Sequence, residues 1–305
     1  MKLVSKIIFL IMFAGPLILK AQHSDDSANR KQLNSLQDSL KAISFQIYNN
    51  NSEPERYNAS YTFIKTLVKA LKTPNSFTFH FDSLKAVSIQ TAPDHKFRIF
   101  SWHVMNNDGS YRYYGTIQMN NAEGKLEMFP LLDFTSGIKK PSDTLTTNEK
   151  WYGAQYYRII PVTNNVRTPY YILLGWKGNT IKSNKKVIEI LHFENGRPVF
   201  GMPVFDGDKN DPNKKRIIFE YTRQASMVLN YEPQQAMIIF DHLAPPDPKL
   251  EGKYDLYGPD FSYDGYKIQN GRLRLVSDLK VENPPTEKDE QFNDPRKLKG
   301  AVIDH

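Results

Sequence analysis

Residues 97–119 read FRIFSWHVMNNDGSYRYYGTIQM, and this stretch decides the fold class. Large apolar side chains alternate at Phe97 and Ile99 and, after a change of phase, at Trp102 and Val104. A turn signal, NDG at 107–109, follows, and residues 111–119 form a second strand-like run. A period of two on both sides of such a turn predicts a β-hairpin. We therefore expect a mostly β, antiparallel protein.

Strand-like runs recur downstream of this hairpin and are separated by turns that contain Gly, Asn or Pro. The runs are 151–162, 170–176, 187–193, 199–205, 216–221, 226–231, 236–240, 254–257, 261–268 and 272–276. Short strands joined by tight turns predict an antiparallel meander over residues 76–282, as a curved sheet, a sandwich or a propeller-like fold. The absence of a helix-length apolar stripe in this region argues against a parallel α/β sheet.

Upstream of residue 75 the apolar period is that of a helix. The positions are Leu33, Leu36, Leu40, Ile43 and Ile47, and then Tyr57, Tyr61, Ile64, Val68 and Leu71. Asn and Ser residues at 49–52 separate the two sets, so we expect a helical hairpin in an N-terminal helical segment, residues 22–75. We expect the polar residues 23–32 to be loose and residues 77–81 to form a strand.

The chain begins with a pattern typical of a secretory signal. Lys2 and Lys6 precede an apolar run at 7–19, and Ala21 offers a cleavage point, so residues 1–21 are predicted to be a signal peptide. The run is shorter than the ~20 residues that span a bilayer. We expect an exported protein of the cell envelope, in the periplasm or at the surface of a Gram-negative bacterium, with no transmembrane segment in the mature chain. Residues 283–305 read as a charged C-terminal tail.

Charge and cysteine content narrow the function classes. The full chain has 40 basic and 33 acidic side chains, and loss of the three lysines in residues 1–21 leaves 37 basic ones. So mild an excess, in an exported protein, argues against nucleic acid as a partner. The chain contains no cysteine, so no disulfide can form and burial of a core must supply the stability.

Several stretches together resemble an uncharacterised family of exported proteins from Bacteroidota. They are PDHKFRIFSW, WYGAQYYRI, YYILLGWKGN, KKVIEILHF, FGMPVF, RIIFEY, DHLAPP and YGPDFSYDG. The resemblance covers most of residues 75–280. It implies an envelope location, and it brings no activity, cofactor or catalytic residue.

Aromatic and acidic side chains supply the candidate ligand-binding residues. Tyrosine and tryptophan combine a flat apolar face with a polar tip, which suits sugars or peptides, although aromatic residues are also common in strands. The candidates are Trp151, Tyr152, Trp176, Tyr257, Asp260, Tyr263 and Asp264. The stretch YGPDFSYDGY at 257–266 is interpreted as mainly structural, with two corners held by Asp260 and Asp264 and an aromatic face between them.

One possible metal site lies in DGDKNDP at 206–212. Asp206, Asp208 and Asn210 occupy positions one, three and five of a calcium loop. The glycine and the glutamate that such a loop needs are missing, so a solvated hairpin loop is the alternative. The sequence predicts no other cofactor.

Two functions remain open from the sequence. The first is a non-catalytic binding or scaffold module whose partner is an envelope protein or a glycan. The alternative is a hydrolase of envelope glycans or other polymers, in which acids such as Asp241, Asp260 or Asp264 form a carboxylate pair.

Overall fold

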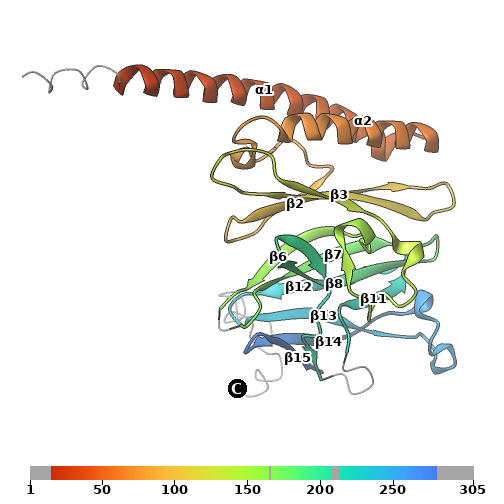
Figure 1. The fold of residues 1–305 in the computed structure, drawn as a ribbon. Coiled ribbons are helices and arrows are strands. Elements are labelled where there is room, and N and C mark those ends of the chain that lie inside the picture. Colours follow the sequence, from red (N-terminus) through yellow and green to blue (C-terminus); the bar gives the residue numbers. More distant parts are fainter. Residues whose placement is uncertain (1–14, 165, 208–212, 280–305) are drawn as a thin grey trace, which may run out of the picture.

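The structure, a computed structural model, describes residues 15–164, 166–207 and 213–279. It consists of four layers: a helical hairpin lies on one β-sheet, and two further sheets follow beneath it (Figure 1). The prediction of a mostly β, antiparallel fold with an N-terminal helical hairpin is therefore confirmed. Successive layers share three apolar cores, and these cores explain most of the sequence pattern.

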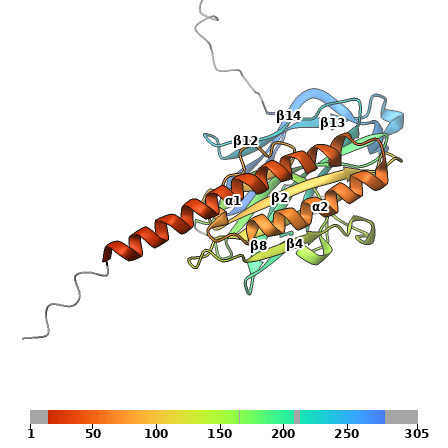
Figure 2. The same cartoon turned by 90° about the horizontal axis from the view of Figure 1, so that it is seen from above.

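The helical hairpin is formed by α1 (Gly15–Asn49) and α2 (Glu53–Leu71), which lie side by side above β2 (Figure 2). Residues 23–32, predicted to be loose, are helical, because no Gly or Pro interrupts them and a helix that has nucleated is extended at little cost. None of the helices within the described residues is both long and apolar enough to cross a lipid bilayer. Residues 1–14 of the predicted signal peptide lie outside the described residues.

The buried face of α2 differs from the predicted one. The predicted Tyr61 is 51% exposed. The residues that α2 buries are Arg56, Ser60, Phe63, Leu67, Ala70 and Leu71. Two of them are polar and are hydrogen-bonded to β2: Ser60 accepts a hydrogen bond from Trp102 Nε1, and Arg56 donates to the carbonyl of Met105. An apolar-period count scores arginine and serine as solvent residues, so it can detect only the apolar part of this face, which is Phe63, Leu67, Ala70 and Leu71.

The upper sheet contains β1 (Ser88–Thr91), β2 (Phe97–Met105), β3 (Tyr111–Met119) and β4 (Met128–Leu132), in that order. The expected change of phase in β2 does not occur. Phe97 and Ile99 face the core below the sheet, whereas Phe100 and Trp102 face the helices. Both faces of the upper sheet are therefore covered.

The central sheet has the strand order β5-β9-β8-β7-β6, and β11 pairs with the first half of β8. Its strands are β5 (Thr146–Thr147), β6 (Gln155–Val162), β7 (Tyr170–Gly178), β8 (Ser183–Glu194), β9 (Arg197–Phe200) and β11 (Ile217–Thr222). Along β7, Tyr171 and Leu173 point to the upper sheet, and Ile172 and Leu174 point to the opposite side. Strands buried on both faces appear in a sequence as continuous apolar runs, as YYILL does.

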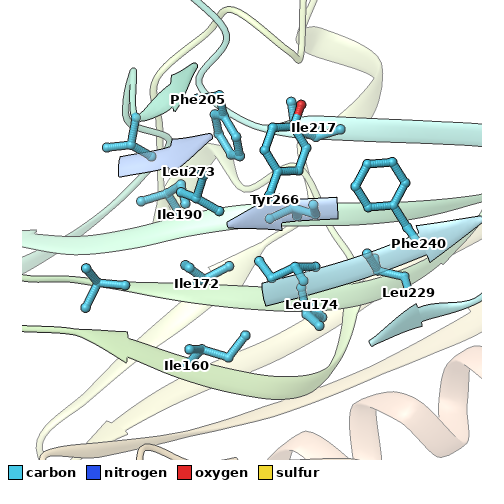
Figure 3. Packing of buried hydrophobic residues seen from close by; sticks show 14 of the residues in the cluster. Ile160, Ile172, Leu174, Ile190, Phe205, Ile217, Leu229, Phe240, Tyr266 and Leu273 are labelled. Carbon is cyan, nitrogen blue, oxygen red and sulfur yellow. The ribbon is translucent and has the colours of Figure 1, made fainter. Parts of the chain in front are cut away.

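The outer sheet has the order β10-β15-β14-β13-β12. Its strands are β10 (Phe205–Asp206), β12 (Leu229–Glu232), β13 (Met237–Ala244), β14 (Gly258–Gln269) and β15 (Arg272–Val276). The pair β10–β15 is parallel, whereas its other strand pairs are antiparallel. Figure 3 shows the core that this sheet shares with the central one, where Ile172 and Leu174 meet Phe240 and Tyr266.

The described residues also form short 3-10 helices, and two of these replace predicted strands. The 3-10 helices are η1 (Ser76–Thr78), η2 (Thr135–Gly137), η3 (Asn148–Lys150), η4 (Pro248–Leu250) and η5 (Tyr254–Leu256). The first replaces the strand expected at 77–81, because the buried Arg98 guanidinium takes the carbonyls of Ser76 and Phe79 as acceptors. The fifth replaces the strand expected at 254–257. The predicted run 199–205 is divided between β9 and β10 at Gly201, whose φ is +98°.

Burial of β2 on both faces gives a direct test. Ile99→Ala and Phe100→Ala should each lower the free energy of unfolding by about 2–5 kcal/mol, since each leaves a cavity in a different core. Arg274→Ala, on an exposed position of the outer sheet, should change it by less than about 0.5 kcal/mol. Urea unfolding measures all three. A neutral result for either core variant would contradict the four-layer arrangement.

Candidate functional site

A groove runs beside α1 at the edge of the helix layer. The helix turns one side to the upper sheet and buries Leu36, Leu40 and Ile47, which leaves Phe45 on the other side with 61% of its surface exposed. The segment that follows η1 passes next to α1, and there the Ser83 amide donates to Gln37 Oε1 at 3.1 Å. An open groove with a volume of about 910 Å³ separates the two.

The lining of the groove is apolar and its rim is charged. Side chains from α1 and from the facing segment contribute to both, and they include Ala42, Phe45, Tyr48 and Ala86 for the lining and Asp38, Lys41, Asp82 and Lys85 for the rim. The four charged side chains are exposed. An apolar floor with a polar edge is typical of a surface that binds another polypeptide.

Tyr48 connects the groove to the interior. Its ring packs edge-on against the ring of His103 at a centroid distance of 5.2 Å. Burial raises the pKa of the Tyr48 hydroxyl above its ordinary value, and burial lowers the pKa of His103 to about 4 although Gln155 hydrogen-bonds to its ring. Both side chains are therefore neutral at pH 7, and the groove floor carries no charge of its own at this point.

A second hollow, of about 640 Å³, lies between residues 180–183 and 252–255. It is more polar than the groove. Glu220 stands in its wall and accepts hydrogen bonds from Ser183 Oγ at 2.7 Å and Asn179 Nδ2 at 3.0 Å. Tyr254 and Ile181 line it with exposed side chains. An exposed tyrosine beside fixed polar groups is a lining that suits a sugar.

The predicted aromatic candidates do not form one surface. Trp151 and Tyr152 are buried, the first against the rings of Tyr113 and Tyr156, so neither offers a face to a ligand. Trp176 is half-buried against His103. Tyr257, which is also buried, accepts a hydrogen bond from the Gly252 amide. The remaining candidates, Asp260, Tyr263 and Asp264, lie on β14 in the outer sheet.

Tyr152 instead belongs to a buried centre of charge. Its ring lies 4.6 Å from Lys177 Nζ and 5.8 Å from the Arg216 guanidinium carbon. Lys177 Nζ donates to the carbonyls of Tyr152 and Gly153, each at 2.8 Å, and to Thr135 Oγ1. Arg216 forms a buried ion pair with Glu189 at 2.7 Å. The contacts of Lys177 hold Tyr152 and Gly153 in place between the upper and the central sheet.

The stretch YGPDFSYDGY forms a bulged strand, not the two predicted corners. The pairing of β13 with β14 shifts between Asp241 and Leu243, and Phe261 stands in the irregular part with φ +70° and 95% of its surface exposed. Asp260 holds this bulge, because it accepts from the Ser262 amide and hydroxyl and pairs with His242 Nδ1 at 2.8 Å. Asp264 accepts from the distant Asp278 amide, not from its own turn.

The acidic residues considered for metal binding are only partly described. Asp206 forms a two-point ion pair with Arg272, at 2.6 Å for each oxygen. Asp208 and Asn210 lie outside the described residues. Within the described ranges no group of three or more His, Asp or Glu side chains is placed to hold a metal ion.

Comparisons with known proteins give no relative. No family model, no curated protein and no solved structure matches this chain.

The groove was not among the sequence predictions. Phe45 and Tyr48 lie outside the apolar period of α1, so the pattern gave them no role. A signal was nevertheless present: the pentapeptide DSLKA occurs twice, at 38–42 and at 82–86, and the structure places both copies on the groove. A search for short exact repeats would have found the two segments.

Lys177 makes the stability depend on pH. Burial lowers its pKa from 10.5 to about 7, while Asp133 acts in the opposite direction. At pH values between about 7 and 10.5, Lys177 is protonated in the unfolded chain but has lost its proton in the folded chain. The free energy of unfolding should therefore rise with pH, by about 2 kcal/mol between pH 7 and pH 9. Urea unfolding at both pH values should show this rise, and Lys177→Met should remove it. In the control Lys182→Met, at an exposed position, the rise should remain.

Phe261 stores backbone strain that a substitution can release. A left-handed conformation is unfavourable for a residue with a side chain and easy for glycine. Phe261→Gly should therefore raise the free energy of unfolding by about 0.5 to 1 kcal/mol, whereas Phe261→Ala, which keeps the strain, should leave it within about 0.5 kcal/mol. A clear loss of stability in both variants would mean that the ring packs against the protein. Thermal unfolding distinguishes these outcomes.

Proposed function

We propose that this protein is an exported, non-catalytic binding module of the cell envelope, and that the groove beside α1 binds another polypeptide. The single observation that carries the proposal is the combination of an open apolar groove with the exposed ring of Phe45 on one bank, the side of the groove that α1 forms. Burial of apolar side chains in such a groove, with charged residues around it, is how helices and extended segments dock on proteins.

The roles of the acidic residues support binding over hydrolysis. A carboxylate pair for hydrolysis needs side chains that can reach a substrate. Asp241 is buried and accepts from the Val228 amide at 2.6 Å, and Asp260 and Asp264 each accept hydrogen bonds that hold the backbone of β14 or of the segment after β15. All three have structural roles, as turn and bulge residues commonly do.

Export and location are part of the proposal and rest on the sequence. The signal pattern in residues 1–21 and the resemblance to exported Bacteroidota proteins support a periplasmic or surface location. The N-terminal residue of the protein recovered from the envelope fraction tests this. We expect Gln22, and a protein that keeps Met1 and remains in the cytoplasm would contradict export.

The polypeptide-binding role is tested by crosslinking in the native host. A photoreactive side chain placed at Ala42, on the groove, should give a discrete protein adduct after irradiation. The same side chain at Lys267, on β14 in the outer sheet, serves as the matched control. Phe45→Asp should remove the adduct, because a carboxylate on the bank opposes burial of the partner's apolar side chain. Equal labelling at both positions, or adducts with saccharide alone, would overturn the proposal.

A further inference from the structure

Both banks of the groove are built from one repeated peptide. Residues 38–46 (DSLKAISFQ) and 82–90 (DSLKAVSIQ) are identical at seven of nine positions. The first copy is helical within α1, and the second forms turns and then enters β1. Leu40 and Leu84, at the same position of the repeat, are both buried in the core under the helices. The repeat thus anchors each bank in one core and leaves its acid and its lysine at the rim.

The rim is neutral and carries the same charges on each bank. Asp38 and Lys41 stand on the α1 side, and Asp82 and Lys85 stand on the facing side. The chain without residues 1–21 keeps 37 basic and 33 acidic side chains, a mild basic excess that is absent from the rim. At this rim each copy offers an acid for every base of the other, so two such rims are complementary in charge.

The same surface holds both a hollow and a projection. Phe45 stands on the bank with 61% of its surface exposed, next to the groove that could receive an aromatic ring. In a two-fold interface the same surface of both copies is in contact. A surface that projects a side chain must therefore also contain the hollow that receives this side chain from the other copy. The charges of the rim and the shape of the surface are thus, independently of each other, both self-complementary, as a two-fold interface requires.

We propose that the polypeptide bound in the groove is a second copy of this chain, related by a two-fold axis, with Phe45 of each copy in the groove of the other. The proposal rests on the proposed function and names its partner. α1 extends the contact surface, since it runs past the edge of the sheets (Figures 1 and 2) and its residues 26–32 are mostly exposed. A stable interface buries on the order of 1,200 Å² or more, which needs more than the groove alone.

Complementary charge variants test the pairing. An acidic-rim variant carries Lys41→Glu and Lys85→Glu, and a basic-rim variant carries Asp38→Lys and Asp82→Lys. Analytical ultracentrifugation of the purified mature chain, which begins at Gln22, should show a dimer. Each rim variant alone should dimerise at least tenfold more weakly, because like charges meet across the axis. A one-to-one mixture of the two variants should restore the dimer as a heterodimer.

The control has the same change in charge at another place. Lys65→Glu with Lys69→Glu, at exposed positions of α2, should leave the dimer unchanged. A wild-type monomer at all concentrations up to about 100 μM, the weak end of specific association, would overturn the inference. So would a dimer that neither rim variant weakens. A monomer that still forms the Ala42 adduct with a different protein would leave the polypeptide-binding function standing, whereas a monomer without any adduct would overturn both.

Discussion

The rest of the structure depends on two successive β-sheets, the upper and the central one, neither of which turns a face to solvent. The upper and the central sheet each have apolar side chains on both sides, so each needs a cover above and below. The helical hairpin supplies the uppermost cover and the outer sheet supplies the lowest. The hydrophobic effect is proportional to the apolar area removed from water. Three stacked cores therefore give a chain without disulfides the burial on which it depends.

Buried basic side chains organise the segments whose carbonyls are not paired by regular secondary structure. Arg98 binds the carbonyls around η1, Arg216 binds the carbonyl of Thr144, and Lys177 binds the carbonyls of Tyr152 and Gly153. A buried carbonyl without a partner is costly, and a guanidinium or ammonium group can satisfy two or three at once. The connection between β4 and β6, which contains η2, β5 and η3, is thus fastened to the sheets by side chains that a hydropathy pattern assigns to the surface. The same chemistry explains why residues 77–81 leave the strand conformation.

Alternation and turn signals allowed the strands of the meander and the helical hairpin to be predicted, because both depend on local periodicity. The layer structure could not be predicted in the same way. A strand with two buried faces, such as β2, has the same appearance as a strand with a change of phase. Trp151 and Tyr152 were placed on a ligand surface for a related reason: a ring is equally suited to a core and to a binding face. The groove depends on which side of α1 the upper sheet covers, and this is a tertiary property.

The repeated nonapeptide also bears on the order of folding. One sequence is a helix in its first occurrence and a turn and strand in its second, so its conformation is decided by its neighbours and not by its own propensity. Helical hairpins assemble from contacts close in sequence, and such contacts generally form before long-range pairing of strands. Early helix formation at 38–46 would keep that copy away from the edge of β2 and leave this edge to the later copy. The chain then avoids a competition between two nearly identical segments for one position in the sheet.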